Sequence, residues 1–375
     1  MASMLKLLKS ASKAIAILAI LLGSVAKYAP NLFFKVPEIG FILYAMTGGK
    51  PIPPFIVNDP YLPGNTDWLK PKDVIVSVAA KSGTTWMLFC AHQIRVKGND
   101  EKYPYVDVNI ATPWPELIQT PGEGWDVVRE KMNTTILEDG TKFKDLWDHP
   151  DYPFRVFKSH EHAETFEKAG LIGDKSDIKF LAMARNGLDM VASMVPFFGA
   201  HSDDFRKIWG NFPPRARESM EEEASARMQE MLPGGVFSPF YFEYINSWWK
   251  VRNEKNVLLL HYSDAKKDLS GTVSRLASFY EVELTKDEHA TVVEKCGFEY
   301  MKKHTDMFTY ALPLNPDFKG KKIMTSGSMT RKGIIGDGKV TFSDEEKEVW
   351  AKAEVDKLGD EPAKLNWARN GGGEF

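Results

Sequence analysis

The chain has 375 residues, of which 43% are hydrophobic and 26% are charged, a composition typical of globular proteins. Its formal net charge of −3 excludes the global basic field that nucleic-acid-binding proteins use, so no nucleic-acid partner is expected. Two cysteines, Cys90 and Cys296, exclude a disulfide framework and a cysteine zinc site, and this low number favours a reducing, cytoplasmic compartment.

The first 46 residues differ in kind from the rest of the chain. No acidic residue precedes Glu38, whereas five lysines do, and 13 apolar or small residues lie between Lys13 and Lys27. This run is short for a membrane-spanning helix, which needs about 17–25 residues. It fits a signal peptide, an organelle-targeting leader, a helix on a membrane surface, or a core helix packed on the main domain. We expect residues 1–50 to be a leader or membrane-associating segment, and residues 1–46 to decide whether the protein is membrane-associated or targeted to an organelle.

After residue 70, apolar runs alternate with helix-like segments. Strands are predicted over residues 73–79, 155–159, 178–184 and 256–262. Helices are predicted over residues 84–96, 187–198, 240–253, 271–280, 285–296 and 343–357. The alternation predicts an α/β fold, a single three-layer domain over residues 51–375 with a mostly parallel central sheet flanked by helices. Residues 100–150 and 199–237 are rich in charge, Pro and Gly and are expected to be irregular, with Glu221 to Glu223 on a solvated face.

The most informative stretch follows the first predicted strand and reads Lys81-Ser82-Gly83-Thr84-Thr85-Trp86. Small residues at a strand-to-helix turn let backbone N–H groups and the helix N-terminus form an anion site. The lysine adds a positive charge, the three hydroxyl groups add donors, and the tryptophan offers a flat face for stacking on a base. A phosphate or sulfate group is therefore expected here. The loop differs from the nucleotide P-loop G-x-x-x-x-G-K-[ST], because its lysine precedes the glycine.

The second predicted strand ends in Lys158-Ser159-His160. Because side chains alternate along an extended strand, Lys158 and His160 point to the same side. Histidine is the side chain best suited to take a proton near neutral pH, so His160 is a candidate general base. His162 lies on the same face and is a rival for this role.

Further cations occur at the end of the third predicted strand and near the C-terminus. Arg185 ends the strand and can grip a phosphate with two parallel hydrogen bonds, and Ser193, about two turns into the next helix, can add a hydroxyl donor. Arg331 and Lys332 stand beside Gly333, as expected of a flexible loop that folds over a phosphate. Together they predict a second anion site.

In this order the motifs resemble those of the cytosolic-type sulfotransferases, over roughly residues 55–360. These enzymes have a P-loop-like fold and use 3′-phosphoadenosine 5′-phosphosulfate (PAPS) as the sulfuryl donor. The resemblance implies that residues 81–86 bind the 5′-phosphosulfate. It implies that the 3′-phosphate is bound by Arg185, Ser193, Arg331, Lys332 and Gly333. It also implies that adenine lies between Trp86 and Phe298 and contacts Tyr262.

The resemblance further implies the chemistry. His160 removes a proton from a hydroxyl or amine of a small, fairly apolar acceptor, and the freed nucleophile attacks sulfur in line. Lys81 and Lys158 offset the charge that grows on the leaving phosphate, so that 3′-phosphoadenosine 5′-phosphate (PAP) is released. No metal is expected, because the lysines supply the positive charge. The acceptor pocket is expected to draw on residues 100–120 and 199–240, which have the least resemblance.

Several positions depart from the family pattern. Ala79-Ala80 stands where an aromatic residue and a proline are usual, and Gly338 stands where a tryptophan is usual. Cys296-Gly297 replaces Thr-Ser, and Ser159 replaces threonine. The family's dimer contact is matched only at its end charges, Lys339 and Glu348, so a homodimer stays an open prediction.

Two alternatives to the sulfotransferase interpretation remain. The first is a nucleotide-dependent small-molecule kinase with an atypical phosphate loop. The order of lysine and glycine in that loop, and the lack of a metal-binding Asp after a strand, disfavour it. The second is a non-catalytic protein that binds the cofactor or a lipid. The presence of both His160 and Lys81 disfavours it.

Overall fold

The computed structural model describes residues 2–373 except 30–31, 34–35, 37–39 and 49–54. Its core is a four-stranded sheet in the order β2-β1-β3-β4. The strands are β1 (Val74–Val78), β2 (Val156–Ser159), β3 (Lys179–Ala184) and β4 (Val257–His261). All three strand pairs are parallel, with Val74 opposite both Val156 and Lys179. The prediction of a mostly parallel sheet built from four strand regions is therefore confirmed.

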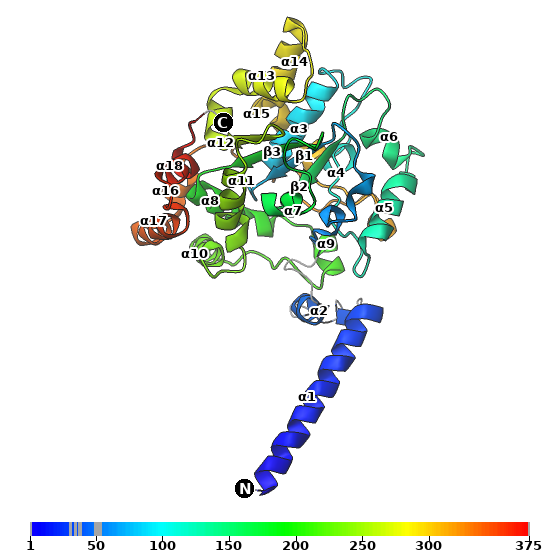
Figure 1. Cartoon of the computed structure of the whole chain (residues 1–375), viewed down its shortest axis with the longest axis vertical. Helices are drawn as coiled ribbons and strands as arrows, with labels where there is room; N and C mark the ends of the chain where they lie inside the picture. The colour runs from blue at the N-terminus through cyan, green and yellow to red at the C-terminus, as the bar shows by residue number, and fades with distance from the viewer. Residues whose placement is uncertain (1, 30–31, 34–35, 37–39, 49–54, 374–375) are drawn as a thin grey trace.

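Helices cover both faces of the sheet (Figure 1), which explains why the strands read as continuous apolar runs. Every residue of β1, β2 and β4 is buried. The six predicted helices are present as α3 (Thr84–Arg95), α8 (Gly187–Gly199), α11 (Phe242–Lys250), α13 (Leu269–Phe279), α14 (Lys286–Cys296) and α17 (Asp344–Leu358). The α/β fold and the three-layer architecture are thus confirmed.

Shorter helices connect these elements. They are α7 (Ala163–Lys168), α12 (Tyr262–Lys267), α15 (Phe298–Lys303), α16 (Asp337–Thr341) and α18 (Pro362–Asn370). Both α12 and α15 begin with the aromatic residue predicted to contact adenine.

The expectation that residues 100–150 and 199–237 are irregular is wrong. They contain α4 (Val108–Ala111), α5 (Trp125–Thr134), α6 (Phe143–Trp147), α9 (Asp203–Ile208) and α10 (Met220–Met231). α10 begins where the Ser219 hydroxyl accepts a hydrogen bond from the Glu222 N–H, a cap that composition alone conceals. Glu223 is not on a solvated face either, because it is buried and pairs with Arg227 at 3.1 Å.

The N-terminal segment forms α1 (Ala2–Tyr28) and α2 (Gly40–Gly48). α1 extends away from the folded domain, with the N-terminus at its far end (Figure 1). Ala26, Phe33 and Tyr44 form a small cluster that joins the two helices.

Five apolar residues from Ile15 to Leu21 are exposed, so the alternative of a core helix packed on the domain is wrong for this part of α1. The expected boundary at residue 50 lies outside the described residues. Within the described part of the chain, no helix combines the length and apolarity needed to cross a bilayer.

Candidate active site

The loop between β1 and α3 has an unusual backbone. Lys81 has a φ of 55° and Gly83 has a φ of 103°, both in the left-handed region. A Cβ atom at Gly83 would lie 2.7 Å from Cε of Met183, at the end of a flexible side chain, and 3.2 Å from Cδ2 of Tyr262, so it is chiefly the left-handed conformation that favours glycine here. The turn thus leads directly into the N-terminus of α3, which begins at Thr84. This is the geometry of an anion-binding helix start.

The side chains of this loop point in different directions. The Thr85 hydroxyl is hydrogen-bonded to the Tyr310 hydroxyl at 2.6 Å, and the Trp86 indole N–H donates to the Cys296 carbonyl at 2.8 Å. The Trp86 ring lies 5.5 Å from the ring of Tyr262. Ser82 is buried, and its hydroxyl donates to the Ala80 carbonyl at 3.3 Å. Two of these residues therefore anchor the loop to segments that are distant in the sequence.

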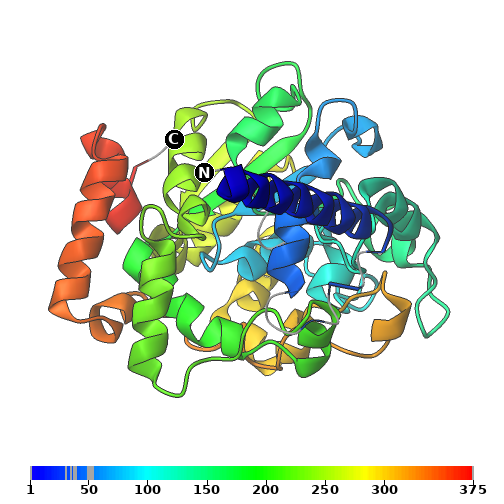
Figure 2. The same ribbon diagram turned by 90° about the horizontal axis from the view of Figure 1, so that it is seen from below.

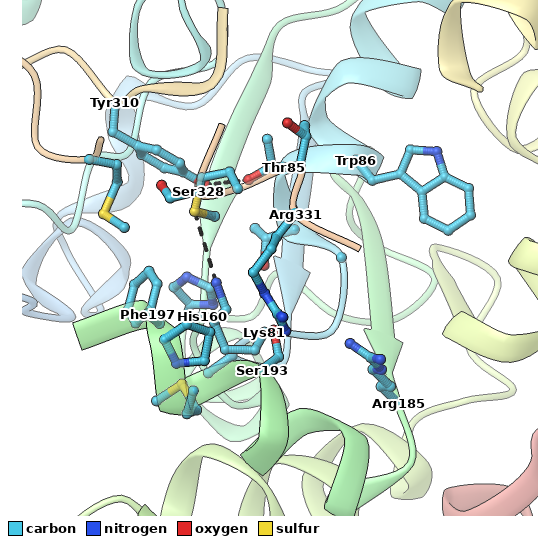
Figure 3. Close-up of a pocket in the computed structure, with 18 of the residues that line it drawn as sticks. Lys81, Thr85, Trp86, His160, Arg185, Ser193, Phe197, Tyr310, Ser328 and Arg331 are labelled. Atoms are coloured by element: carbon cyan, nitrogen blue, oxygen red, sulfur yellow. Dashed lines mark hydrogen bonds between the residues drawn. The ribbon is translucent and has the colours of Figure 1, made fainter. Parts of the chain in front are cut away.

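One cavity of about 330 Å³ collects nearly all of the sequence-predicted residues (Figure 3). It is lined by Lys81, Gly83, Thr84, Thr85, Trp86, Lys158, His160, Arg185, Ser193, Tyr262, Phe298, Arg331, Lys332 and Gly333. Ser82 is the predicted residue that does not line it. The cavity opens at the carboxyl ends of the parallel strands, where sites of this fold class lie.

The side chain of His160 is hydrogen-bonded to the backbone at the end of the neighbouring strand, β1. Its Nδ1 lies 2.6 Å from the Val78 carbonyl oxygen. Since a carbonyl oxygen can only accept, Nδ1 carries the proton and Nε2 is left with its lone pair. Burial, followed by the charge of Lys158, lowers the pKa of His160 to about 3, so the ring is neutral near pH 7. The rival His162 bonds through Nε2 to the Pro239 carbonyl at 3.0 Å and does not line the cavity.

Two lysines face the cavity against aromatic surfaces. Nζ of Lys81 lies 3.9 Å from the centre of the Phe197 ring and 3.9 Å from Sδ of Met329. Nζ of Lys158 lies 3.5 Å from the centre of the Trp114 ring. Burial, followed by the charges of Arg185 and Arg331, lowers the pKa of Lys81 to about 7. Burial also lowers the pKa of Lys158 well below its usual value. Both ammonium groups are thus poised to gain an anionic partner.

Arg185 lies where β3 ends. Its Nη2 donates to the Ile334 carbonyl at 2.7 Å and lies 3.5 Å from Asp189 of α8. Nε of Arg185 is buried and has no hydrogen-bond partner among the described residues. Its guanidinium carbon lies 4.6 Å from the centre of the Tyr262 ring. Because an unsatisfied buried N–H is costly, this nitrogen is a donor available to a bound anion.

The C-terminal basic loop, residues 331–338, is held close to Arg185 by hydrogen bonds and ion pairs with two aspartates. Asp189 accepts hydrogen bonds from the backbone N–H groups of Gly336 and Gly338 at 2.8 and 2.9 Å. Asp337 pairs with Arg331 at 3.1 Å and with Lys332 at 2.7 Å. The loop is therefore held beside Arg185, although about 150 residues separate them in the chain.

Two glycines of this loop are required by close packing. A Cβ atom at Gly333, whose φ is 60°, would lie 2.6 Å from the Phe298 ring. A Cβ atom at Gly338 would lie 2.5 Å from the backbone carbon of Leu188. The glycine that replaces the family's tryptophan at position 338 thus lets α16 pack directly on α8.

The other part of the cavity is apolar and aromatic. Its lining includes Phe197, Phe198, Phe205, Phe212, Phe237 and Phe240. Four of these residues come from the segment 199–240, and Trp114 and Leu117 of the same lining come from 100–120, the two segments from which the sequence predicts the acceptor pocket. Sequence reasoning missed Phe55, Tyr310, Met324 and Met329, which also line the cavity. They occur in no motif, and no signal in the sequence could have found them.

Comparison with known proteins agrees with this geometry. A profile of the family described as "Sulfotransferase domain" matches residues 71–361, most of the chain. Sulfotransferase 2A1 of Rattus norvegicus is 27% identical over 300 residues, covering 80% of this chain and 89% of that protein. An amine sulfotransferase of Oryctolagus cuniculus is 26% identical over 302 residues, covering 80% and 86%.

Solved structures show the same fold. A retinol dehydratase, crystallised with androsterone and the inactive cofactor PAP, matches with a TM-score of 0.54 and 20% identity, covering 78% of this chain and 82% of that one. The chain therefore belongs to the sulfotransferase domain family. It is a PAPS-dependent sulfotransferase, and PAP is its nucleotide product. Among the described residues, no group of His, Cys, Asp or Glu is arranged to hold a metal ion.

Proposed function

We propose that this enzyme transfers the sulfuryl group of PAPS to a hydroxyl, or an amine, of a small apolar acceptor, with His160 as the general base. The observation that carries the proposal is the hydrogen bond from Nδ1 of His160 to the Val78 carbonyl, which leaves Nε2 as a base facing the cavity. The ring is neutral near pH 7, as a base must be before it takes a proton.

The donor is held at both of its ends. The backbone of residues 81–86 and the start of α3 receive the 5′-phosphosulfate. The 3′-phosphate lies between Arg185 and Ser193 on one side and the loop Arg331 to Gly333 on the other, and the unpaired Nε of Arg185 supports this assignment. Adenine packs between Trp86 and Phe298, with Tyr262 beside it. No metal is needed in this arrangement.

The proposed step is an in-line displacement at sulfur. The acceptor oxygen or nitrogen forms a bond to sulfur, its proton passes to Nε2 of His160, and the bond between sulfur and the phosphate oxygen breaks. Lys81 and Lys158, whose ammonium groups lie against aromatic rings, stabilise the negative charge that develops on the leaving phosphate.

The acceptor is proposed to be an apolar alcohol, phenol or amine, because the acceptor side of the cavity is lined mostly by phenylalanines. The test is a panel of phenols, alicyclic alcohols and aryl amines with sulfur-labelled PAPS. We expect label on an apolar member and none on sugars. Phosphate transfer from ATP with magnesium would instead support a kinase, and PAP binding without any transfer would support a non-catalytic protein.

Three organisational features are also proposed. Residues 1–50 act as a membrane-associating segment of a cytoplasmic enzyme, and residues 51–375 form the sulfotransferase domain. A homodimer would use the surface around Lys339, next to which Val340 is 82% exposed. Analytical ultracentrifugation of the full chain in detergent, with and without Val340→Asp, tests the dimer.

A further inference from the structure

The described part of α1 presents apolar side chains on every side. Ile15, Ile17, Leu18, Ile20 and Leu21 are between 56% and 69% exposed. Successive helix residues are about 100° apart, so these five residues cover about 220° of the helix circumference. The exposed residues Ala16 and Ala19 lie in the remaining sector, so one flat protein surface cannot cover the apolar side chains of α1. The helix is thus unlike the surface helices of the domain, which bury one stripe.

The charges of α1 have a single sign. Lys6, Lys9, Lys13 and Lys27 belong to it, and no acidic residue occurs before Glu38. Tyr28 is 76% exposed, and Nζ of Lys27 lies 5.1 Å from its ring centre. An apolar helix that ends in lysine and tyrosine matches the interface of a bilayer, and the uniform positive charge complements anionic headgroups.

α2 connects this helix to the acceptor side of the cavity. Figures 1 and 2 place α2 between α1 and the domain. Ile42 of α2 lines a second cavity together with residues 203–215 and 227–237. Three phenylalanines, Phe198, Phe212 and Phe237, line both this second cavity and the active-site cavity, hereafter the acceptor cavity because the acceptor is proposed to bind there. Among the described residues no other side chain lines both cavities, so we infer that these three rings lie between the two spaces.

We propose that α1 docks the enzyme on an anionic phospholipid membrane and that the apolar acceptor enters from the membrane side, through the second cavity and past these three phenylalanines. The route rests on the proposed sulfuryl transfer, whereas the docking does not. If the acceptor enters by this route, it is a hydroxyl compound dissolved in the membrane.

Docking is tested by co-sedimentation of the full chain with vesicles of phosphatidylcholine, alone or mixed with phosphatidylserine. We expect binding to the mixed vesicles that is lost when Lys6, Lys9, Lys13 and Lys27 are all changed to Gln. The matched control carries Gln at four exposed lysines of the domain, Lys72, Lys102, Lys250 and Lys255, and should bind as the wild type does. Equal binding to both vesicle types, or self-association through α1 without vesicles, would overturn the docking.

The entry route is tested with two acceptors, an apolar alcohol dissolved in mixed vesicles and a water-soluble phenol. Val236 lines the second cavity but not the acceptor cavity, so Val236→Trp should narrow the route alone. We expect kcat/KM for the vesicle acceptor to fall at least about tenfold, with PAP affinity unchanged. An unchanged rate on the vesicle acceptor, with vesicle binding intact, would place the entrance elsewhere. Failure of the wild type on both acceptors would count against the proposed transfer instead.

A separate observation concerns the buried carboxyl group of Glu116, which is 0% exposed and whose pKa is raised well above its usual value by burial. It accepts hydrogen bonds from the Trp114 indole N–H and from the Ser159 hydroxyl. The centre of the Trp114 ring lies 3.5 Å from Nζ of Lys158. It lies 5.2 Å from the centre of the His160 ring, and the two rings meet edge-on. The Lys158 N–H also donates to the Pro113 carbonyl at 2.8 Å. The side chain of Glu116 thus connects Trp114, which contacts Lys158 and His160, with Ser159, which stands between them in the sequence.

The geometry points to Glu116 as a positioning residue, which aims Lys158 and His160 by holding Trp114 and Ser159. Glu116→Leu should lower kcat by about tenfold to a hundredfold, while PAP affinity stays the same. Glu116→Gln should restore most of the rate, since its amide oxygen can accept from Trp114 and its NH₂ can donate to Ser159.

The matched control is Asp73→Leu, which removes a buried carboxylate at the opposite end of β1 that pairs with Arg155. We expect it to lower the melting temperature without a selective loss of kcat. A Gln variant as slow as the Leu variant, or an equal loss of kcat in the control, would overturn the positioning role.

Discussion

At the scale of single residues, the site contains several basic side chains, and some of them face no acidic side chain that the structure describes. Nε of Arg185 is buried without a hydrogen-bond partner in the described part of the chain, and Lys81 lies against Phe197 and Met329. Buried cations of this kind favour a ligand with anionic groups at both ends. The properties of each cation should therefore change measurably when PAP binds.

The first prediction concerns recognition of the 3′-phosphate. Arg331→Ala removes a charge-assisted contact, so PAP should bind about ten- to a hundredfold more weakly. Adenosine 5′-phosphosulfate, which lacks the 3′-phosphate, should bind the variant and the wild type equally. Calorimetry with both ligands measures this, and equal weakening for both would contradict the assignment.

The second prediction concerns the proton on Lys81. Burial lowers the pKa of Lys81 to about 7, so at about pH 8 this side chain is mostly neutral. A bound anion favours the charged form, so PAP binding should take up close to one proton, and PAP affinity should fall as pH rises above 7.

Calorimetry in buffers with different ionisation enthalpies measures this uptake. Lys81→Arg is the matched control, because arginine stays charged throughout and should abolish the uptake. Proton uptake that is the same in both proteins would show that another group titrates.

At the scale of elements, the decisive contacts are between helices and the loops that cross them. α16 lies on α8 because Gly338 has no side chain, and Asp189 of α8 binds the backbone of the same loop. The position therefore accepts neither the family's tryptophan nor a smaller side chain without a shift of the backbone.

The third prediction follows from this contact. Gly338→Ala should reduce the free energy of unfolding by about 1–3 kcal/mol, because its Cβ meets the Leu188 backbone. It should also weaken PAP binding, since the basic loop moves with α16. Gly124→Ala, where no atom lies within 4 Å of an added Cβ, is the control and should cost less than about 1 kcal/mol. Chemical denaturation of the two variants measures the difference.

At the scale of the whole molecule, the sequence predicted what local patterns encode. The four strand regions and six helices were readable from their periodicity, and the motif residues meet at one edge of the sheet as parallel topology requires. Tyr310 and Phe55 could not be placed, and the hydrogen bonds of Glu116 could not be predicted, because they arise from contacts between distant segments. The helices in residues 100–150 and 199–237 were missed because Pro, Gly and charge masked their caps and buried faces.

The measurement that tests the account most directly compares two histidines that are two residues apart. His160→Ala should lower kcat by about a hundredfold to ten-thousandfold, with PAP affinity unchanged, because the base is lost while the donor site remains. His162→Ala should leave kcat nearly unchanged, because its Nε2 bonds to Pro239 outside the cavity. Single-turnover transfer from labelled PAPS, with PAP binding measured in parallel, gives both quantities. An active His160→Ala enzyme, or an equal loss in His162→Ala, would contradict the proposed mechanism.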